Sequence, residues 1–289
     1  MRQTEYYTSD YNYYDQPRNR YNVLNKIKGN RPLINVALFL LTVATTYLVN
    51  GIFYSLSIVA ILFAHEMGHY LMCRKHGISA TLPFFIPIPF GPFGTMGAFI
   101  KIRERIPNRR ALFDVGVAGP LAGLALTIPI LIIGLYNSSF VKLDTIPQGN
   151  LFLGESFLFT QLAKIILGTA PKGYDTVLHP MAYAGWAGLF VTALNLLPIG
   201  QLDGGHVLYS LFGHKSQPVF KFAMLAFIII AAILYPGWLL LIILLLWIGF
   251  QHPVPDNDYI QLDPKRRLIG YFTFAIFLIS FIPVPFYIR

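Results

Sequence analysis

An apolar run of membrane-spanning length with ionisable side chains inside it most constrains what this chain can fold into. Residues 55–73 read SLSIVAILFAHEMGHYLMC, close to the roughly 20 apolar residues that a helix needs to cross a bilayer. Ionisable residues in such a helix are costly and are by default a functional hypothesis. His65 and His69 lie four residues apart, on one face of a helix, so both imidazoles can reach one metal ion. The run therefore predicts a membrane helix that carries a metal site.

Glu66 completes the zinc-binding pattern HExxH in this run. A carboxylate directly after the first histidine reaches a water on the metal rather than the metal itself. We therefore expect Glu66 to act as a general base. The alternative, histidines that are only hydrogen-bonded to a neighbouring helix, explains one lone histidine better than two with this spacing.

The composition indicates an all-α polytopic membrane protein. Hydrophobic residues make up 55% of the 289 residues, charged ones 12%, and the mean hydropathy is +0.56. The net charge of +9 comes from basic clusters beside apolar runs, which are typical of topology signals and not of nucleic-acid binding. The lone cysteine, Cys73, excludes an intramolecular disulfide.

The first 31 residues differ from the rest of the chain. They are rich in tyrosine and polar residues without helical or strand periodicity, which predicts a flexible tail, with a docking arm for a partner as the alternative. Basic residues in the second half of this tail place the N-terminus in the cytoplasm. Residues 32–289 are expected to form one membrane-embedded domain.

The apolar runs predict six to seven transmembrane helices. The first span starts at Pro32 and turns near Asn50-Gly51 into the second, which carries the histidines. Further spans are expected at 111–136 and 181–197, as a hairpin within 218–250 that turns at Pro236-Gly237, and from 268 to 286. The count is seven, or six if that hairpin is shallow.

Residues 80–102, after the second span, are apolar but hold four prolines and three glycines among residues 83–97, which a helix interior does not accept. We expect a re-entrant β-hairpin or loop there, because non-helical backbone at membrane depth must be covered by protein or line a wet cavity. Two roles are open: an edge strand that pairs with an unwound substrate, or a structural plug.

The third span carries small residues at 116–123, GVAGPLAG, which let helices approach closely. They are expected to pack against the histidine helix. Asp114, at the entrance of this span, is interpreted as an interfacial charge in preference to a partner of the metal site.

A catalytic zinc takes three protein ligands and leaves one position open. After the fourth span, the stretch NLLPIGQLDGGH at 195–206 breaks the helix at Pro198 and its glycines. This break is expected near the cytoplasmic face of the membrane, the face that His65 and His69 also approach. We expect Asp203 to be the third ligand, with His206 as its competitor.

Three stretches together resemble the site-2 protease family of intramembrane zinc metalloproteases: HEMGH at 65–69, AGPLAG at 118–123 and NLLPIGQLDGGH at 195–206. The resemblance covers a core of residues 55–210. It implies that one Zn²⁺ per chain is held by His65, His69 and Asp203, that Glu66 is the base, and that Asn195 donates to the substrate backbone or oxyanion. The chain resembles a compact core of this family, without the PDZ or CBS domains that many members carry.

The resemblance implies an intramembrane zinc metalloendopeptidase that cuts single-span membrane proteins in or near their transmembrane segments. The alternatives are a catalytically idle client-binding protein on the same fold and a metal or haem protein of transport or redox type. The expected partners are such substrates and the lipid bilayer, not nucleic acid, and the oligomeric state is left unassigned. The expected location is the plasma membrane of a prokaryote, with a plastid or other organelle membrane as the alternative.

Overall fold

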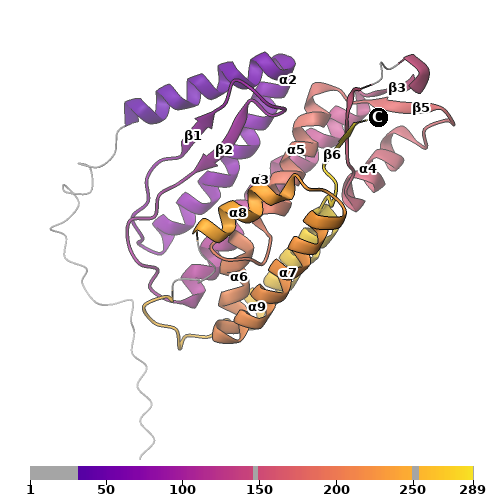
Figure 1. Ribbon diagram of the computed structural model, residues 1–289. Helices are drawn as coiled ribbons and strands as arrows, with labels where there is room; N and C mark the ends of the chain where they lie inside the picture. The colour runs from indigo at the N-terminus through magenta and orange to yellow at the C-terminus, as the bar shows by residue number, and fades with distance from the viewer. Residues whose placement is uncertain (1–31, 146–148, 249–253, 289) are drawn as a thin grey trace, which may run out of the picture. The chain divides into compact units, whose positions relative to one another are not determined.

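The computed structural model describes residues 32–145, 149–248 and 254–288. The predicted tail, residues 1–31, lies outside them. The described chain is mostly helical (Figure 1), as expected of a membrane protein. By length and composition, three of its helical stretches can cross a membrane: Pro32–Lys75, Arg109–Tyr136 and Asp203–Ile233. The described helices thus give three candidate spans, fewer than the predicted six to seven.

Helix α2 (Pro32–Lys75) folds back on itself. Asn50 and Gly51 leave the helical conformation, and Gly51 has φ +72°, a left-handed value that glycine adopts without steric cost. The kink divides α2 into a first arm, residues 32–49, and a second arm, residues 52–75, with Ser55 Oγ donating back to the Val43 carbonyl at 2.9 Å. The turn predicted at Asn50-Gly51 is therefore confirmed.

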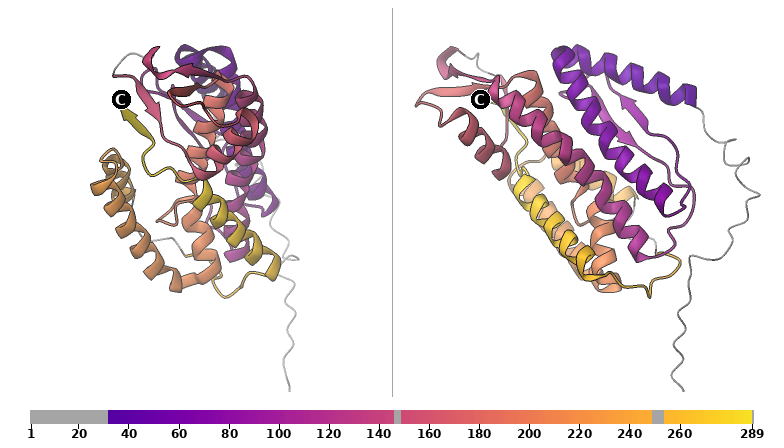
Figure 2. Two further views of the ribbon diagram at one scale, coloured as in Figure 1. Left: turned by 90° about the vertical axis from the view of Figure 1, so that its right-hand side faces the viewer. Right: turned by 180° about the vertical axis from the view of Figure 1, so that it is seen from behind.

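A two-stranded antiparallel hairpin of β1 (Phe84–Pro87) and β2 (Thr95–Phe99) lies between the two arms of α2 (Figures 1 and 2). Its backbone is tied to side chains of both arms. Asn35 Nδ2 donates to the Pro83 carbonyl at 2.7 Å, and the Tyr54 hydroxyl donates to the Phe93 carbonyl at 2.9 Å. The proline-rich stretch thus forms a hairpin whose carbonyls are bonded by buried polar side chains, as non-helical backbone in an apolar setting requires.

Helix α3 (Arg109–Tyr136) runs beside the second arm of α2 and beside α5 (Pro180–Asn195) (Figure 2). Glycines allow the close approach on both sides. A Cβ at Gly68 of α2 would overlap the Ala118 carbonyl, and one at Gly188 of α5 would lie 2.6 Å from Thr127 Oγ1. The predicted packing of the small residues of α3 against the histidine helix is confirmed.

The chain continues through α6 (Asp203–Phe212), the 3-10 turn η3 (Gly213–Ser216) and α7 (Gln217–Ile233). It then turns through residues 234–237 into α8 (Trp238–Ile248), as the Pro236-Gly237 pair predicts. Helix α9 (Pro264–Ser280) follows, capped by the Asp263 side chain, which accepts from the Arg266 amide.

Two further small sheets form near the C-terminal end of α3. The first pairs β3 (Ser139–Lys142) with β5 (Tyr174–Val177), and the second pairs β4 (Leu151–Leu153) with β6 (Phe286–Ile288). The turn η2 (Leu143–Thr145) and helix α4 (Phe157–Leu167) complete this region. The sequence did not predict these strands. The last span was expected to reach residue 286, but α9 ends at Ser280 and β6 follows.

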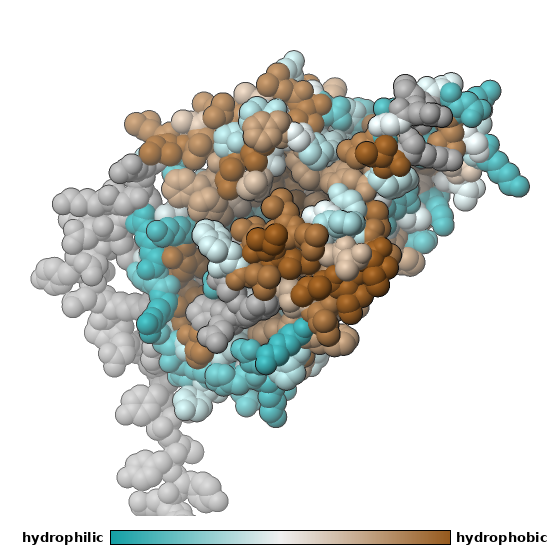
Figure 3. Space-filling view, viewed as in Figure 1, coloured by the Kyte–Doolittle hydropathy of each residue, from teal (hydrophilic) through white to brown (hydrophobic). Residues whose placement is uncertain are grey.

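The core is centred on the aromatic rings of α5. Trp186 is fully buried, stacks on Phe190 with ring centroids 5.6 Å apart, and donates from Nε1 to the Gly154 carbonyl. Outside this core, large apolar side chains of α7 and α8 are exposed, among them Phe222, Leu240 and Trp247, and hydrophobic residues cover that face (Figure 3). Large exposed apolar areas of this kind suit a lipid environment.

Candidate metal centre

Three side chains from two elements converge on one point. His65 and His69 extend from the second arm of α2, one turn apart, and their Nε2 atoms are 3.1 Å from each other. Asp203 Oδ2 of α6 lies 3.4 Å from His65 Nε2 and 3.3 Å from His69 Nε2. Both histidines are buried. The structure therefore brings together the three residues that the sequence singled out as ligands, from positions that are 134 to 138 residues apart in the chain (203 − 69 and 203 − 65).

The position of Asp203 follows from the break after α5. Helix α5 ends at Asn195, and the chain turns through residues 196–202 before α6 begins at Asp203. Gly204 and Gly205 make this turn tight, because a Cβ on either would overlap the carbonyl of Leu196 or Gly200. A side chain larger than hydrogen at these positions would push Asp203 away from the histidines.

The tautomer of His69 is set by the backbone of α3. Its Nδ1 lies 2.8 Å from the Val115 carbonyl oxygen, which can only accept, so Nδ1 carries the hydrogen. In the neutral ring this leaves Nε2 with a lone pair directed at His65 Nε2 and Asp203 Oδ2. A backbone carbonyl behind a metal-binding imidazole is the usual orienting partner.

The donor set fits a divalent metal ion. Two imidazole nitrogens and one carboxylate oxygen are typical ligands of zinc, and ligands on a tetrahedral zinc are about 3.3 Å apart. The three distances found here, 3.1, 3.3 and 3.4 Å, match that edge length. Without a cation between them, two lone pairs and a carboxylate would face each other in a buried site, which is unfavourable.

The three ligand atoms open onto a pocket of about 290 Å³, here called the triad pocket. Glu66 is buried in its wall, and the backbone of Ile100, just after β2, lies next to the Glu66 carboxylate. Asn195 Nδ2, from the end of α5, lies 3.2 Å from His65 Nε2. The pocket thus contains, beside the three ligands, the Glu66 carboxylate and the Asn195 amide, and Gln201 and His206 also line it.

Helix α3 acts as a template for the two histidine rings. A Cβ at Gly119 would overlap the imidazole of His69, and a Cβ at Gly123 would lie 3.3 Å from His65 Cβ and Nδ1. One turn earlier, a Cβ at Gly116 would lie 3.0 Å from His206 Cβ. The small residues of the 116–123 stretch therefore make room for the side chains of the site as well as for helix packing.

Asp114, interpreted from the sequence as an interfacial charge, forms partly buried ion pairs with two other elements. Its side chain is only 13% exposed and accepts two hydrogen bonds from Arg266 of α9, Nε to Oδ1 at 2.7 Å and Nη2 to Oδ2 at 2.8 Å. His76 Nε2, just past α2, lies 2.9 Å from Oδ2. Arg266 also contacts Asp263, which lowers the pKa of that carboxyl. Asp114 therefore links the ends of three helices next to Val115, the residue that orients His69.

His206 lines the triad pocket but is not in the group whose ligand atoms converge. Sequence reasoning missed Val115 and Ile100, which act through backbone atoms and so leave no residue-type signal. It also missed Gln201, which lines the pocket in the break before α6.

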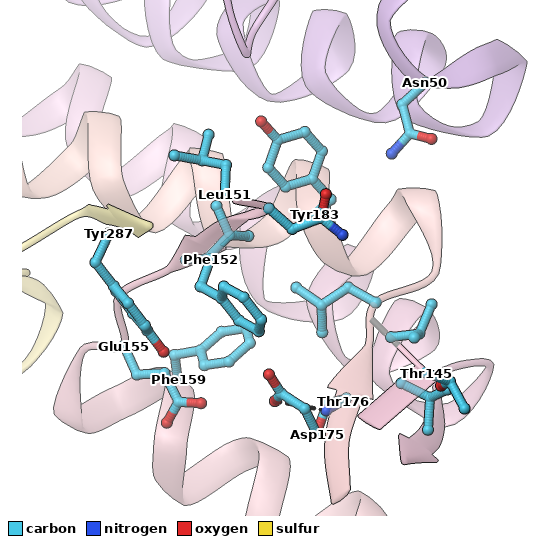
Figure 4. A pocket seen from close by; sticks show the side chains of 15 residues that line it. Asn50, Thr145, Leu151, Phe152, Glu155, Phe159, Asp175, Thr176, Tyr183 and Tyr287 are labelled. Carbon is cyan, nitrogen blue, oxygen red and sulfur yellow. Dashed lines mark hydrogen bonds between the residues drawn. The ribbon is translucent and has the colours of Figure 1, made fainter. Parts of the chain in front are cut away.

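A second cavity, of about 580 Å³, lies at the opposite end of α2's second arm and of α5, near Asn50 and Tyr183. Figure 4 shows Glu155 and Asp175 on one side of it and these two residues on the other. The Glu155 carboxylate accepts from Thr160 Oγ1 at 2.7 Å, and Asp175 Oδ1 accepts from the Thr176 amide. Neither carboxylate is in the group of converging ligand atoms found among the described residues.

Comparison with known proteins gives the family. Residues 53–236 match the model of peptidase family M50. The chain belongs to this family. The resemblance to the site-2 proteases is thereby confirmed, and the matched range contains both histidines, Glu66, Asn195 and Asp203.

The curated relatives are longer proteins. The chain is 32% identical over 235 residues to probable zinc metalloprotease EGY2, chloroplastic, of Arabidopsis thaliana, covering 78% of this chain and 40% of the relative. It is 31% identical to EGY2 of Oryza sativa subsp. indica, covering 82% and 43%, and 38% identical to EGY1 of Oryza sativa subsp. japonica, covering 55% and 28%. The M50 chain thus spans about two fifths or less of these relatives. No solved structure matches it significantly.

Proposed function

We propose that this M50 family member is an intramembrane zinc metalloendopeptidase that hydrolyses peptide bonds in or near the transmembrane segments of membrane proteins. The observation that carries the proposal is the convergence of His65 Nε2, His69 Nε2 and Asp203 Oδ2 at tetrahedral spacing, with Glu66 in the same pocket. The names of the curated relatives, probable zinc metalloproteases, support it. A site that only held a structural metal would not need a carboxylic acid beside the ligands.

Five polar residues of the pocket have a role in this reaction. His65, His69 and Asp203 hold the zinc, which when bound supplies Lewis acidity toward a peptide carbonyl and lowers the pKa of water. Glu66, oriented by the Ile100 backbone, takes a proton from the attacking water. The water oxygen bonds to the carbonyl carbon, and the C–N bond breaks as Glu66 passes the proton to the leaving amine. Asn195 is proposed to donate its amide hydrogen to the substrate's carbonyl oxygen.

We propose that the substrate binds as an extended strand beside β2. A transmembrane helix satisfies its own amides, so it must unwind before a carbonyl can be attacked. The hairpin lies between the arms of α2, and Ala98 and Phe99 of β2 line the triad pocket, which favours strand pairing over the plug alternative. Single-span proteins with helix-breaking residues at the cut are the expected substrates.

The membrane topology belongs to the same proposal. Six to seven spans with a re-entrant hairpin, and a cytoplasmic N-terminus, put the basic residues of 101–110 and 265–267 on the cytoplasmic side. The EGY2 relatives are chloroplastic by name, so a plastid membrane is proposed beside the prokaryotic plasma membrane.

The test is cleavage by the purified chain of single-span substrates in liposomes, with cut sites mapped by mass spectrometry and zinc measured by elemental analysis. We expect one zinc per chain, cleavage that a chelator abolishes and zinc restores, and loss of cleavage with zinc retained in Glu66→Gln. If Glu66→Gln cleaves at the wild-type rate, Glu66 is not the base. If the wild type binds zinc and substrates but cuts none of them, the idle client-binding alternative holds.

A further inference from the structure

Beside the triad pocket lies a larger one of about 680 Å³, here called the basic pocket. The two pockets share three lining residues, Ile102, Gln201 and His206. A peptide that leaves the triad pocket past these residues therefore enters the basic pocket. Its remaining lining residues come from the segment after β2, from α3 and from the loop before α9.

One continuous segment of the chain, extended as far as Arg103, follows both pockets in order. Residues 98–100 and Ile102 line the triad pocket, and residues 102–106 line the basic pocket. One edge of this segment is paired: the Thr81 amide donates to the Lys101 carbonyl, and the Arg103 amide donates to the Ser79 carbonyl. Backbone groups of an extended chain alternate between its two edges, so Ile100 and Ile102 face the other way, and Ile100 meets Glu66.

A substrate strand paired along this open edge would run from Glu66 to the basic pocket. Arg103 is three residues beyond Ile100, which corresponds to about 10 Å of extended chain at roughly 3.3 Å per residue. Arg105 follows after a bend of the chain at Glu104. The side chains of both arginines would therefore lie beside substrate residues about three to five positions from the bond that is cut.

The charge of the basic pocket selects the chemistry of those residues. Arg103 and Arg105 line it and are exposed. Glu104, an acidic residue that also lines the basic pocket, accepts a hydrogen bond from Ser79 Oγ at 2.6 Å. Guanidinium groups bind carboxylates through charge-assisted hydrogen bonds and repel Lys and Arg.

We infer that the basic pocket is a substrate subsite in which Arg103 and Arg105 select an acidic residue three to five positions from the scissile bond. The inference rests on the proposed function and adds a substrate class to it. The cytoplasmic segments that flank transmembrane helices carry an excess of Lys and Arg. This subsite would therefore favour the minority of membrane proteins whose flanking segments are acidic. Binding of an anionic lipid headgroup by the same arginines is the competing explanation.

The test compares three single-span substrates that differ only at those positions, with Glu, Gln or Lys, in liposomes of phosphatidylcholine. We expect the wild type to cut the Glu substrate about three- to tenfold faster, as kcat/KM, than the Gln substrate, the size of effect that two exposed ion pairs give. The Lys substrate should be slowest. In Arg103→Gln/Arg105→Gln, the Glu substrate should fall to the rate of the Gln substrate, whereas Arg105→Glu should favour the Lys substrate.

Arg110→Gln is the matched control. Arg110 belongs to the same basic cluster but donates to the Gln261 carbonyl, and it is not a lining residue of either pocket. We expect it to keep the full preference for the Glu substrate. Equal rates on Glu and Gln substrates in the wild type, or a preference that survives in the double variant, would overturn the inference.

Two further arms separate the other outcomes. If the double variant slows all three substrates equally and loses only its association with phosphatidylglycerol liposomes, the arginines bind lipid. If no substrate is cut at all, the proposed function fails, and the subsite is tested by binding. Fluorescence anisotropy on Glu66→Gln protein should then show weaker binding of the Gln peptide than of the Glu peptide, and equal binding would remove the subsite too.

Discussion

Adding one methyl group to α3 should weaken metal binding although no ligand is replaced. In Gly119→Ala the new Cβ would overlap three atoms of the His69 ring, Nε2, Cδ2 and Cε1. A carbon contact is at its optimum near 3.5–4 Å, so the ring must move by roughly 1 Å or more. Metal–ligand distances tolerate only about 0.2 Å. His69 can then no longer share an ion with His65 and Asp203.

The expected size of the effect follows from this geometry. Changes in residues that merely orient a ligand cost about 10- to 100-fold in metal affinity, and Gly119→Ala displaces the ligand itself. We therefore expect the zinc Kd to rise at least about 100-fold, or about 2.8 kcal/mol. The assay is a zinc titration of the detergent-solubilised protein against a chelating fluorophore, with circular dichroism to follow the helices.

Two alanine variants of the same helix serve as controls. A Cβ at Gly123 lies 3.3 Å from His65, a distance that a shift of a few tenths of an ångström relieves, so Gly123→Ala should raise the Kd less than about tenfold. A Cβ at Gly134 would overlap the Ala182 backbone, far from the site, so Gly134→Ala should lower the unfolding temperature while keeping zinc affinity. Wild-type affinity in a folded Gly119→Ala variant would refute the template role of α3.

Two other predictions test the site and its support. Asp114→Asn breaks a partly buried, bidentate pair with Arg266 and should lower the free energy of unfolding by about 1–3 kcal/mol, with a zinc Kd about tenfold higher because Val115 loses its anchor. The control Arg110→Gln removes only an exposed hydrogen bond to the Gln261 carbonyl and should change neither quantity, whereas unchanged values in Asp114→Asn would refute the anchoring. Asp203→Ala should abolish stoichiometric zinc binding in elemental analysis, whereas His206→Ala should keep one zinc per chain; the opposite pair of results would make His206 the third ligand.

Much of the helical arrangement could be predicted because it depends on local signals. Asn50-Gly51 and Pro236-Gly237 stop helices by their own backbone preferences, and the turns lie at those pairs. The hairpin after α2 was predictable for the same reason, since Pro83 and Pro87 exclude a helix there. The converging ligands were predictable because HExxH places two of them by helix geometry alone.

The parts that could not be predicted depend on partners distant in the sequence. Strand β6 exists because it pairs with β4, more than 130 residues earlier. Its sequence, FYI, does not distinguish a strand from the end of an apolar membrane helix. Asp114 meets Arg266 across 152 residues, and a single sequence cannot assign one carboxylate to one of many arginines. The local sequence pattern predicts a helix or a strand, but tertiary packing decides which other segment it contacts.

The accuracy of the site therefore depends on α3 as much as on the ligands. Asp114 ties the helix to Arg266 and His76, the next residue offers its carbonyl to His69, and Gly116 lies against His206 and the Asp203 carbonyl. Two of these three consecutive residues thus contact the site, the third anchors the helix, and Gly119 and Gly123 accommodate the rings. Ligands on α2 and α6 can keep spacings near 3.3 Å because one rigid helix lies against both. A change in these small residues is consequently expected to alter metal binding before it alters the fold.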